Sequence, residues 1–359
     1  MANLTGLDLG SRSFKGVALA KAKTGYSLLS LAYQDLPFPE EDVSKEDLLA
    51  ENLKRFMKES GLRMRDVALS IPGESASLKV AEMAKMTPEE LRKILPYEIE
   101  QHLPITPEEY VIDFQVLGTA ASDATKMNVL LAGGRLEVAE ALYKAATQAK
   151  LNCVAVDVDD LALVNMFEVN YAWEEDYQKV VCLLNVGNRI TSVIIFDGGQ
   201  YRFSRPVTIA GETLTKDIQR DFSLKAEQAE DLKREQGKVV VEASGSFSLS
   251  MFDTADRTLR VAEAFSGSLN KLVTQVKLCH DYYETQFKGR TVEKILLAGG
   301  GASLKNLDRF LADKLSVPVE FADPFRQIKV PARPAVSALI EAHGAAFGVG
   351  VGLALRRFG

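Results

Sequence analysis

The alternation of hydrophobic and polar positions predicts strands at the start of the chain, followed by one amphipathic helix. Three apolar segments separated by tight turns come first. A helix with apolar residues three and four positions apart then leads to a further strand. The expected strands are TGLDLGS, FKGVALAK, YSLLSLAYQDL and RDVALSIPG, and the expected helix is KEDLLAENLKRFMKESG. The opening of the chain is therefore expected to follow the order β-β-β-α-β.

The middle of the chain predicts a separate unit with the order β-α-β-β-α-β. Its first helix has a clear N-terminal signature, with Thr87 as N-cap, Pro88 in the first position and Glu90 completing a capping box. Pro104 is expected to end this helix. The unit is compact enough to be a subdomain inserted into a larger lobe, and a helix from Asp160 then returns the chain.

The opening pattern recurs in the second half of the chain. The segments LDLGSRSFKGVAL and LLNVGNRITSVII both have the order strand, glycine turn, strand, and Asn185 stands 177 positions after Asp8. Two similar β-rich lobes facing each other would enclose a cleft. Helices are expected in GETLTKDIQRDFS, KAEQAEDLKREQG and the long run from Leu259, whereas Val239–Thr258 is the most loop-like segment.

These patterns predict an α/β protein of two lobes with an inserted β-α-β-β-α-β subdomain. The expected divisions are 1–73 for the first part of the first lobe, 74–158 for the inserted subdomain, 159–178 for the return helix, 179–334 for the second lobe and 335–359 for a C-terminal helix that returns to the first lobe.

The first glycine hairpin carries groups that suit a phosphate. The turn at Gly10 exposes backbone N–H groups, and convergent N–H dipoles form an anion site. Ser11 and Arg12 lie in the same turn, and Lys15 adds a positive charge. Asp8 would orient Mg²⁺ through water, because Mg²⁺ keeps several of its waters. An ordinary hairpin turn would also explain this segment by itself.

Two further segments could face the same cleft. The second hairpin has Asn185 and Gly187 at its turn and the hydroxyl of Thr191 at its far side. The third segment, Gly299–Gly301 followed by Ser303, separates a strand from a helix, where glycines allow a ligand to approach the backbone closely. It matches neither a Rossmann fingerprint nor a Walker loop. A plain hairpin would also explain the second segment by itself, whereas packing alone explains a run of three glycines poorly.

Composition argues against three classes of protein: those that bind nucleic acid, those that bind zinc and those that span a membrane. The chain has 359 residues, with 43 basic and 49 acidic residues and a net charge of −6, so phosphate backbones and anionic lipid do not attract it. The residues Cys153, Cys182 and Cys279 are too scattered for a zinc site, as are the three histidines. We find no signal peptide and expect no apolar stretch near the roughly 20 residues of a membrane span. A cytoplasmic protein that does not bind nucleic acid is expected.

Taken together, the two hairpins and the glycine run resemble the superfamily of actin, hexokinase and the heat-shock chaperones. That resemblance implies an actin-like, ribonuclease-H-like fold with ATP and Mg²⁺ between the lobes. The phosphate loops would comprise Asp8, Gly10, Ser11, Arg12 and Lys15 in the first lobe, and Asn185, Gly187, Thr191 and Gly211 in the second. The adenosine would meet Gly299, Gly300, Gly301 and Ser303, with Glu230 and Lys233 reaching the ribose and base. A solvated helix face is the alternative for Glu230 and Lys233.

Within that superfamily the chain closely resembles the PilM family of type IV pilus assembly. The resemblance lies in KMTPEELRKILPYEIEQHLPITPEEYVIDFQVLG, VAVDVDDLALVNMFE, GETLTKDIQRDFSLKAEQAEDLKREQG and the ending GVGLALRR, and it spans essentially the whole chain. It implies a protein at the inner membrane that binds the cytoplasmic N-terminal peptide of a PilN-like membrane protein, together with other pilus assembly components. Membrane association would come through partners only.

One position departs from the family pattern. The resemblance implies that relatives usually carry an acid at the start of the second hairpin, where this chain has Asn185, so one group that would orient Mg²⁺ is missing. We therefore expect slow or negligible ATP hydrolysis. Two alternatives remain open at this point. One is a scaffold like the cytoplasmic part of the secretion protein GspL, without nucleotide, and the other is a small-molecule kinase of the same superfamily.

Overall fold

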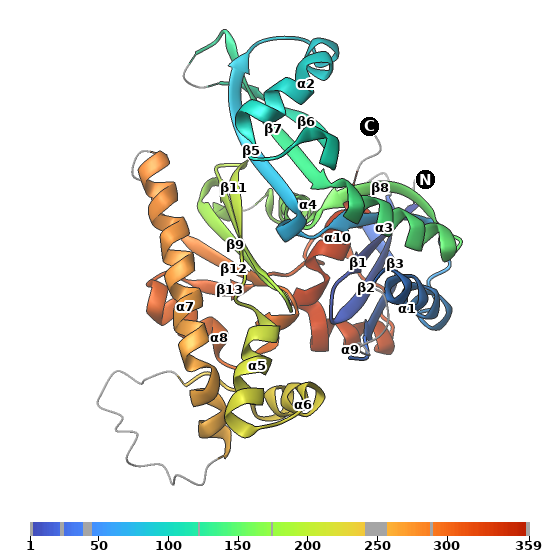
Figure 1. Ribbon diagram of the computed structural model, residues 1–359, viewed down its shortest axis with the longest axis vertical. Coiled ribbons are helices and arrows are strands. Elements are labelled where there is room, and N and C mark those ends of the chain that lie inside the picture. Colours follow the sequence, from blue (N-terminus) through green and yellow to red (C-terminus); the bar gives the residue numbers. More distant parts are fainter. Residues whose placement is uncertain are drawn as a thin grey trace.

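The computed structural model describes residues 3–21, 25–38, 45–120, 123–173, 175–240, 257–287 and 290–356. Most of the segment Val239–Thr258 lies outside the described residues. The described chain forms three sheets, and helices cover their faces (Figure 1).

A six-stranded sheet with the order β14-β3-β2-β1-β4-β8 forms the first lobe. Its strands are β1 (Asn3–Leu9), β2 (Ser13–Lys21), β3 (Tyr26–Asp35), β4 (Asp66–Ile71), β8 (Asn152–Val158) and β14 (Ile328–Lys329). The helices α1 (Lys45–Glu59) and α3 (Leu136–Gln148) share one apolar core with this sheet, and α4 (Asp159–Tyr171) packs elsewhere on it. The predicted β-β-β-α-β start is confirmed.

A five-stranded sheet with the order β11-β10-β9-β12-β13 forms the second lobe. Its strands are β9 (Val180–Val186), β10 (Thr191–Asp197), β11 (Gln200–Val207), β12 (Lys294–Ala298) and β13 (Val319–Phe321). Its helices are α5 (Gly211–Phe222), α6 (Ala226–Gln236), α7 (Arg257–Gln286) and α8 (Leu307–Leu315). The strands β11-β10-β9-β12 of this sheet have the same order and relative directions as β3-β2-β1-β4 of the first lobe. The internal repeat seen in the sequence therefore extends to the topology.

A small antiparallel sheet, β5-β7-β6, stands apart at the top of Figure 1. It consists of β5 (Ala76–Ala84), β6 (Tyr110–Thr119) and β7 (Lys126–Arg135), with α2 (Pro88–His102) packed on it. We call these four elements the inserted unit. The capping box is confirmed, because the Thr87 hydroxyl accepts from the Glu90 N–H at 3.2 Å and the Glu90 carboxylate accepts from the Thr87 N–H at 2.8 Å.

The element order predicted for 74–158 is found, but the structure divides these six elements between two sheets. The strand β8 pairs in parallel with β4, and α3 packs against α1. Both therefore belong to the first lobe, and only β5, α2, β6 and β7 form the inserted unit. A parallel pairing between distant strands leaves no local signal in the sequence, so the pattern alone could not separate these elements.

The C-terminal segment fills the core beneath β1. It comprises α9 (Pro334–His343), a 3₁₀ turn (Gly344–Phe347) and α10 (Gly348–Leu355). The glycines let α10 approach very closely, since a Cβ on Gly6 would overlap the Gly350 carbonyl oxygen and one on Gly352 would overlap that of Ala162. The backbones of β1, α10 and α4 are therefore packed directly against one another.

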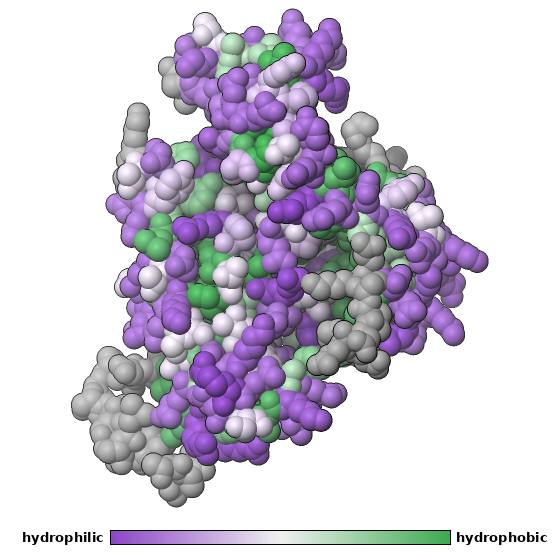
Figure 2. Space-filling view, viewed as in Figure 1, coloured by the Kyte–Doolittle hydropathy of each residue, from purple (hydrophilic) through white to green (hydrophobic). Residues whose placement is uncertain are grey.

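The expectation that no segment reaches the length of a membrane span is wrong for this tail. Among the described residues, Pro334–Leu355 is a helical stretch of 22 residues that is long and apolar enough by length and composition, and 56% of its most apolar window is buried. Burial between β1 and α4 requires the same composition in a core helix. On the face shown in Figure 2 the surface is mostly hydrophilic, with apolar residues in small separate areas.

Candidate functional site

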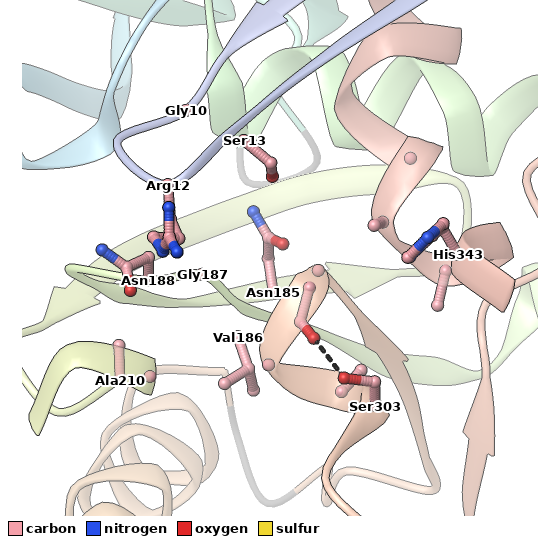
Figure 3. Close-up of a pocket in the computed structure, with 18 of the residues that line it drawn as sticks. Gly10, Arg12, Ser13, Asn185, Val186, Gly187, Asn188, Ala210, Ser303 and His343 are labelled. Atoms are coloured by element: carbon pink, nitrogen blue, oxygen red, sulfur yellow. Dashed lines mark hydrogen bonds between the residues drawn. The ribbon is translucent and has the colours of Figure 1, made fainter. Parts of the chain in front are cut away.

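A cavity of about 990 Å³ lies between the two lobes. We call it the cleft. Nearly all of the residues predicted to bind nucleotide line it: Asp8, Gly10, Ser11, Arg12, Lys15, Asn185, Gly187, Gly211, Glu230, Lys233, Gly299, Gly300, Gly301 and Ser303. Figure 3 shows Gly10, Arg12 and Ser13 on one side of it, facing Asn185, Gly187 and Asn188 on the other. The structure thus brings together three segments that are far apart in the sequence.

The first loop joins β1 to β2 and is taken as residues 8–15, so that it includes Asp8 and Lys15, whose ion pair holds its base. Asp8 and Lys15 are directly opposite in the antiparallel ladder, and the Lys15 ammonium lies 3.1 Å from the Asp8 carboxylate. Both side chains are largely buried. A Cβ on Gly10 would lie 3.1 Å from the Lys15 nitrogen, so glycine leaves this ammonium accessible from the turn.

Arg12 provides an unsatisfied cation at the tip of this loop. Its Nε and Nη1 are buried and have no hydrogen-bond partner among the described residues, and its guanidinium lies 4.3 Å from the centre of the Phe38 ring. Leaving buried guanidinium donors unpaired is costly, and phosphate oxygens are well suited to pair with them. The first loop therefore offers two cations, Lys15 and Arg12, to an anion in the cleft.

The second loop, 187–190, joins β9 to β10 and is braced by α5. The Gly187 carbonyl accepts the Gly211 N–H at 3.1 Å, and the Asn188 carbonyl accepts the Glu212 N–H at 2.7 Å. Gly211 therefore lines the cleft, but its N–H is not free to bind a phosphate. Asn188 also donates to the Ser11 hydroxyl across the cleft at 3.1 Å, and these two residues stand 177 positions apart, at equivalent places in the repeat.

Thr191 is the one predicted site residue that does not line the cleft. It is fully buried, and its hydroxyl donates to the Ile209 carbonyl at 2.7 Å. Ser192 lines the cleft instead, because successive residues of a strand face opposite sides. The internal repeat also indicates that Ser192, not Thr191, is the equivalent of Lys15. Ser192 stands 177 positions after Lys15, and it lies opposite Asn185 in the strand ladder as Lys15 lies opposite Asp8.

The glycine run has two roles. Gly299 has a φ of 90°, and a Cβ there would overlap the Val186 carbonyl, while one on Gly301 would lie too close to the Val186 side chain. These two glycines thus allow β12 to approach the second loop. A Cβ on Gly300 would meet open space, so this position alone leaves room for a ligand. Ser303 donates to the Gly300 carbonyl at 2.8 Å and closes the 3₁₀ turn (Figure 3).

Glu230 and Lys233 line the cleft but are already paired. The Lys233 ammonium donates to Glu230 at 2.6 Å, to the Thr215 hydroxyl at 2.8 Å and to the Gly211 carbonyl at 2.9 Å. Burial lowers the pKa of Lys233. Burial acts to raise the pKa of Glu230, but the charges and hydrogen bonds of Lys233, Thr215 and Arg234 hold it below its usual value. This cluster braces the wall formed by α5 and α6.

Two ion pairs join the lobes beside these loops. Arg234 of α6 donates to both carboxylate oxygens of Asp35, at 2.7 and 3.0 Å, and its Nε donates to Glu230 at 3.1 Å. Arg189 of the second loop lies 3.4 Å from Glu74 of the first lobe. The Asn188–Ser11 bond and these two ion pairs all bridge the cleft.

The sequence reasoning missed Asp159, which lines the cleft at the start of α4. Burial raises its pKa well above the usual value, and the negative charge of Asp8 raises it further, while a hydrogen bond from Ser70 opposes this. Two neighbouring carboxylates in a buried site favour a cation between them, and Mg²⁺ commonly uses one or two carboxylates together with phosphate oxygens. Asp8 and Asp159 therefore fit the expected metal. The acidic pair directly after a predicted strand was the available signal.

Comparison with known proteins agrees with this geometry. The sequence model of the family described as "Type IV pilus assembly protein PilM" matches residues 6–243 and 254–358. A solved structure described as a PilM-PilN type IV pilus biogenesis complex is 25% identical, covers 98% of both chains and has a TM-score of 0.82. MreB5 of Spiroplasma citri bound to AMPPNP has a TM-score of 0.52 at 13% identity, covering 98% of this chain and 95% of its own, which bears on the fold alone.

The cell division protein FtsA of Pseudomonas aeruginosa is 25% identical over 234 residues, covering 61% of this chain and 54% of FtsA. The chain thus spans about half the length of the curated relatives it matches. The predicted actin-like fold is confirmed by these similarities.

Proposed function

The chain belongs to the PilM family of type IV pilus assembly proteins, and on that premise we propose that it is an ATP-binding component of a pilus assembly machine. The observation that carries nucleotide binding is the cleft, where Lys15 and Arg12, whose Nε and Nη1 have no partner among the described residues, face one cavity. Two cations beside a glycine turn suit a polyphosphate. We propose that both hold the phosphates of ATP.

We propose that Asp8 and Asp159 hold Mg²⁺, in part through water, and that the metal neutralises phosphate charge. The adenosine is expected to lie along Gly300, where the backbone is open, and against the wall that Glu230 and Lys233 brace. Because the polar atoms of those two side chains are partnered within the protein, we expect them to shape the pocket more than to contact the ribose.

ATP hydrolysis is expected to be slow or negligible. Asn185 stands where the family resemblance implies a carboxylate, and the Asp8 carboxylate is engaged by Lys15. Neither group is then free to orient an attacking water as a base. Steady-state phosphate release faster than about 1 per second, the low end of ordinary enzyme turnover, would contradict this expectation.

We further propose that the chain binds the cytoplasmic N-terminal peptide of a PilN-like membrane protein, since PilM is found with PilN in the similar solved complex. Such binding would hold a cytoplasmic protein at the inner membrane. A second cavity, of about 340 Å³, lies where the inserted unit meets the two lobes, and we propose that the peptide enters there. Peptides commonly bind in grooves with apolar walls and a few polar anchors.

The two proposed sites share a wall. Asp159 lines the cleft and its neighbour Asp160 lines the second cavity, both in the first turn of α4. Ser192 lines the cleft and also donates to Asp160. A shift of this turn on binding Mg-ATP would therefore change the second cavity as well, and the coupling would be reciprocal.

Calorimetry with ATP, with and without Mg²⁺, tests the first proposal. We expect saturable one-to-one binding by the wild-type chain and weaker, less Mg²⁺-dependent binding by the Asp8→Ala variant. A folded wild-type chain that binds no ATP would instead favour the scaffold without nucleotide.

Pull-down with a synthetic N-terminal PilN peptide tests the second proposal. Equal peptide affinity with and without Mg-ATP would contradict the coupling.

A further inference from the structure

One bidentate ion pair joins the two lobes at the rim of the cleft. Arg234 of α6 lines the cleft and donates to both carboxylate oxygens of Asp35, at 2.7 and 3.0 Å. Asp35 is the last residue of β3 and does not itself line the cleft. The two side chains are 43% and 40% exposed, so the pair lies where the cleft meets solvent. We call it the rim pair.

The second-lobe end of the rim pair is fixed to the second loop. The Arg234 Nε donates to the buried Glu230 carboxylate at 3.1 Å, which also accepts from the Lys233 ammonium at 2.6 Å. Lys233 donates in turn to the Gly211 carbonyl at 2.9 Å. The Gly211 N–H donates to the Gly187 carbonyl at 3.1 Å. An unbroken series of hydrogen bonds therefore runs from Arg234 to the second loop.

The first-lobe end of the rim pair is fixed to the first loop. The N–H of Leu36, directly after Asp35, donates to the Arg12 carbonyl at 2.9 Å. The Tyr33 hydroxyl donates to the Asp35 carboxylate at 3.2 Å, and the Tyr33 ring stacks on His343 with the ring centroids 3.9 Å apart. Asp35 is thus held by the backbone of the first loop on one side and by an aromatic stack on the other.

This arrangement makes the rim pair stronger than its exposure alone would suggest. An isolated exposed ion pair contributes little, because solvent screens it and two long side chains lose freedom. Here the pairing is bidentate, and other hydrogen bonds already hold both partners in place, so less freedom is lost when they meet. The rim pair therefore connects the two loops around the edge of the cleft and opposes their separation.

We propose that the Arg234–Asp35 pair is a latch that holds the cleft closed over its nucleotide and sets the rate at which the nucleotide leaves. Release requires the pair to break so that the lobes can move apart at the rim. The inference rests on the proposed function, because it assumes a nucleotide in the cleft. It adds control of exchange, since steps that open a closed site often limit how fast a ligand leaves.

Stopped-flow release of a fluorescent ATP analogue, chased with excess Mg-ATP, tests the latch in the full chain. Asp35→Asn removes the charge at nearly constant shape. Because Asp35 does not line the cleft, a lost contact with the ligand cannot explain a change in release. We expect release to become about fivefold faster, as for a weakened hydrogen bond between charged groups.

The matched control is Glu82→Gln. It breaks the ion pair between Glu82 and Lys126, whose side chains are 35% and 47% exposed and belong to two strands of the inserted unit. Neither residue lines the cleft. The control should therefore leave the release rate unchanged, although it removes a charge from a pair of similar exposure.

A double-mutant cycle separates the latch from a change in the cleft wall. Arg234→Gln should also speed release, but it removes the bond to Glu230 as well as the bonds to Asp35. If the pair acts as one unit, adding Asp35→Asn to Arg234→Gln should speed release little further. Circular dichroism checks that each variant is folded.

The inference is overturned if either folded single variant releases the analogue within about twofold of the wild-type rate, the range expected for an ordinary surface pair. It is also overturned if the two substitutions are simply additive. If only one single variant folds, its release rate decides alone. Failure of the wild-type chain to bind the analogue would overturn the proposed nucleotide binding, and the latch with it. Wild-type binding with unchanged release in the variants overturns the latch alone.

Discussion

The two loops that face each other across the cleft share a backbone plan but carry different chemistry. Each follows the central strand of its sheet and turns at a glycine, and equivalent residues stand 177 positions apart. Asp8 and Lys15 form an ion pair at the base of the first loop, whereas Asn185 and Ser192 hold the same places in the second. The repeated topology therefore does not repeat the charge.

Because of this difference, we assign different roles to the two loops. The first loop offers the cations and the carboxylate that a metal-bound nucleotide requires. The second loop is used mainly for packing, since α5 donates its first N–H groups to it and two glycines of β12's turn rest on it. We conclude that nucleotide affinity should depend mostly on the first loop, and that the second loop should matter more for folding and for closure of the cleft.

The strongest test of this asymmetry is Lys15→Met. We expect ATP affinity to fall about a hundredfold, or ~3 kcal/mol, because an ammonium bonded to phosphate is lost and Asp8 is left facing the phosphates alone. Calorimetry measures the change, and circular dichroism checks the fold. The equivalent variant Ser192→Ala should change ATP affinity less than about threefold. Equal losses in the two variants would remove the proposed asymmetry.

Adding the missing charge to the second loop should make the loops more alike. Asn185→Asp places a second carboxylate beside the phosphates, and we expect ATP binding without Mg²⁺ to weaken about tenfold through charge repulsion. Mg²⁺ should restore it, because the added carboxylate also orients the metal. Titrations with and without EDTA compare the two states. An unchanged Mg²⁺ dependence would show that residue 185 lies too far from the metal to act on it.

The arginines at the loop tips allow a matched comparison. Two buried donors of Arg12 in the cleft have no partner in the part of the chain that the structure describes, whereas the equivalent Arg189 is half exposed and pairs with Glu74. We expect Arg12→Ala to weaken ATP binding about tenfold and Arg189→Ala to change it less than about twofold, since exposed ion pairs contribute little. A larger effect for Arg189 would assign the phosphates to the second loop instead.

The variant Thr191→Val tests whether the Thr191 hydroxyl stabilises the fold or binds ATP. The variant keeps the shape but leaves the Ile209 carbonyl without its donor, so we expect a loss of about 1 kcal/mol in the free energy of unfolding. Urea denaturation measures this loss. ATP affinity should stay within error of wild type, and a clear drop in affinity would return Thr191 to the binding site.

These residues also show how far the sequence could lead. Local pattern located both hairpins and the capping box at Thr87, because glycine turns and caps depend on neighbours in the chain. The local pattern assigned the cleft hydroxyl of the second hairpin to Thr191, one residue before Ser192, which lines the cleft. Successive side chains of a strand point to opposite faces, so an error of one residue places the hydroxyl on the wrong face. Aligning the two repeats by their offset from Lys15 would have found the right one.

Contacts between distant segments left no signal in the local sequence pattern. Asp35 and Arg234 are 199 positions apart, and nothing local distinguishes them from other surface charges. Asp159 was visible as part of an acidic pair, but its nearness to Asp8 depends on β8 lying beside β4 and β4 beside β1. The parallel order of these strands is set by packing across the whole lobe, which a single sequence does not encode in any one window.

The position of α10 has a consequence for how the protein is made. Residues 348–355 complete the core under β1, which leaves the ribosome long before them. The first lobe therefore cannot close until α10 has been synthesised, and its apolar underside stays uncovered for that time. A nascent chain in this state is a natural client for chaperones, and a chain without α10 would keep the core under β1 uncovered.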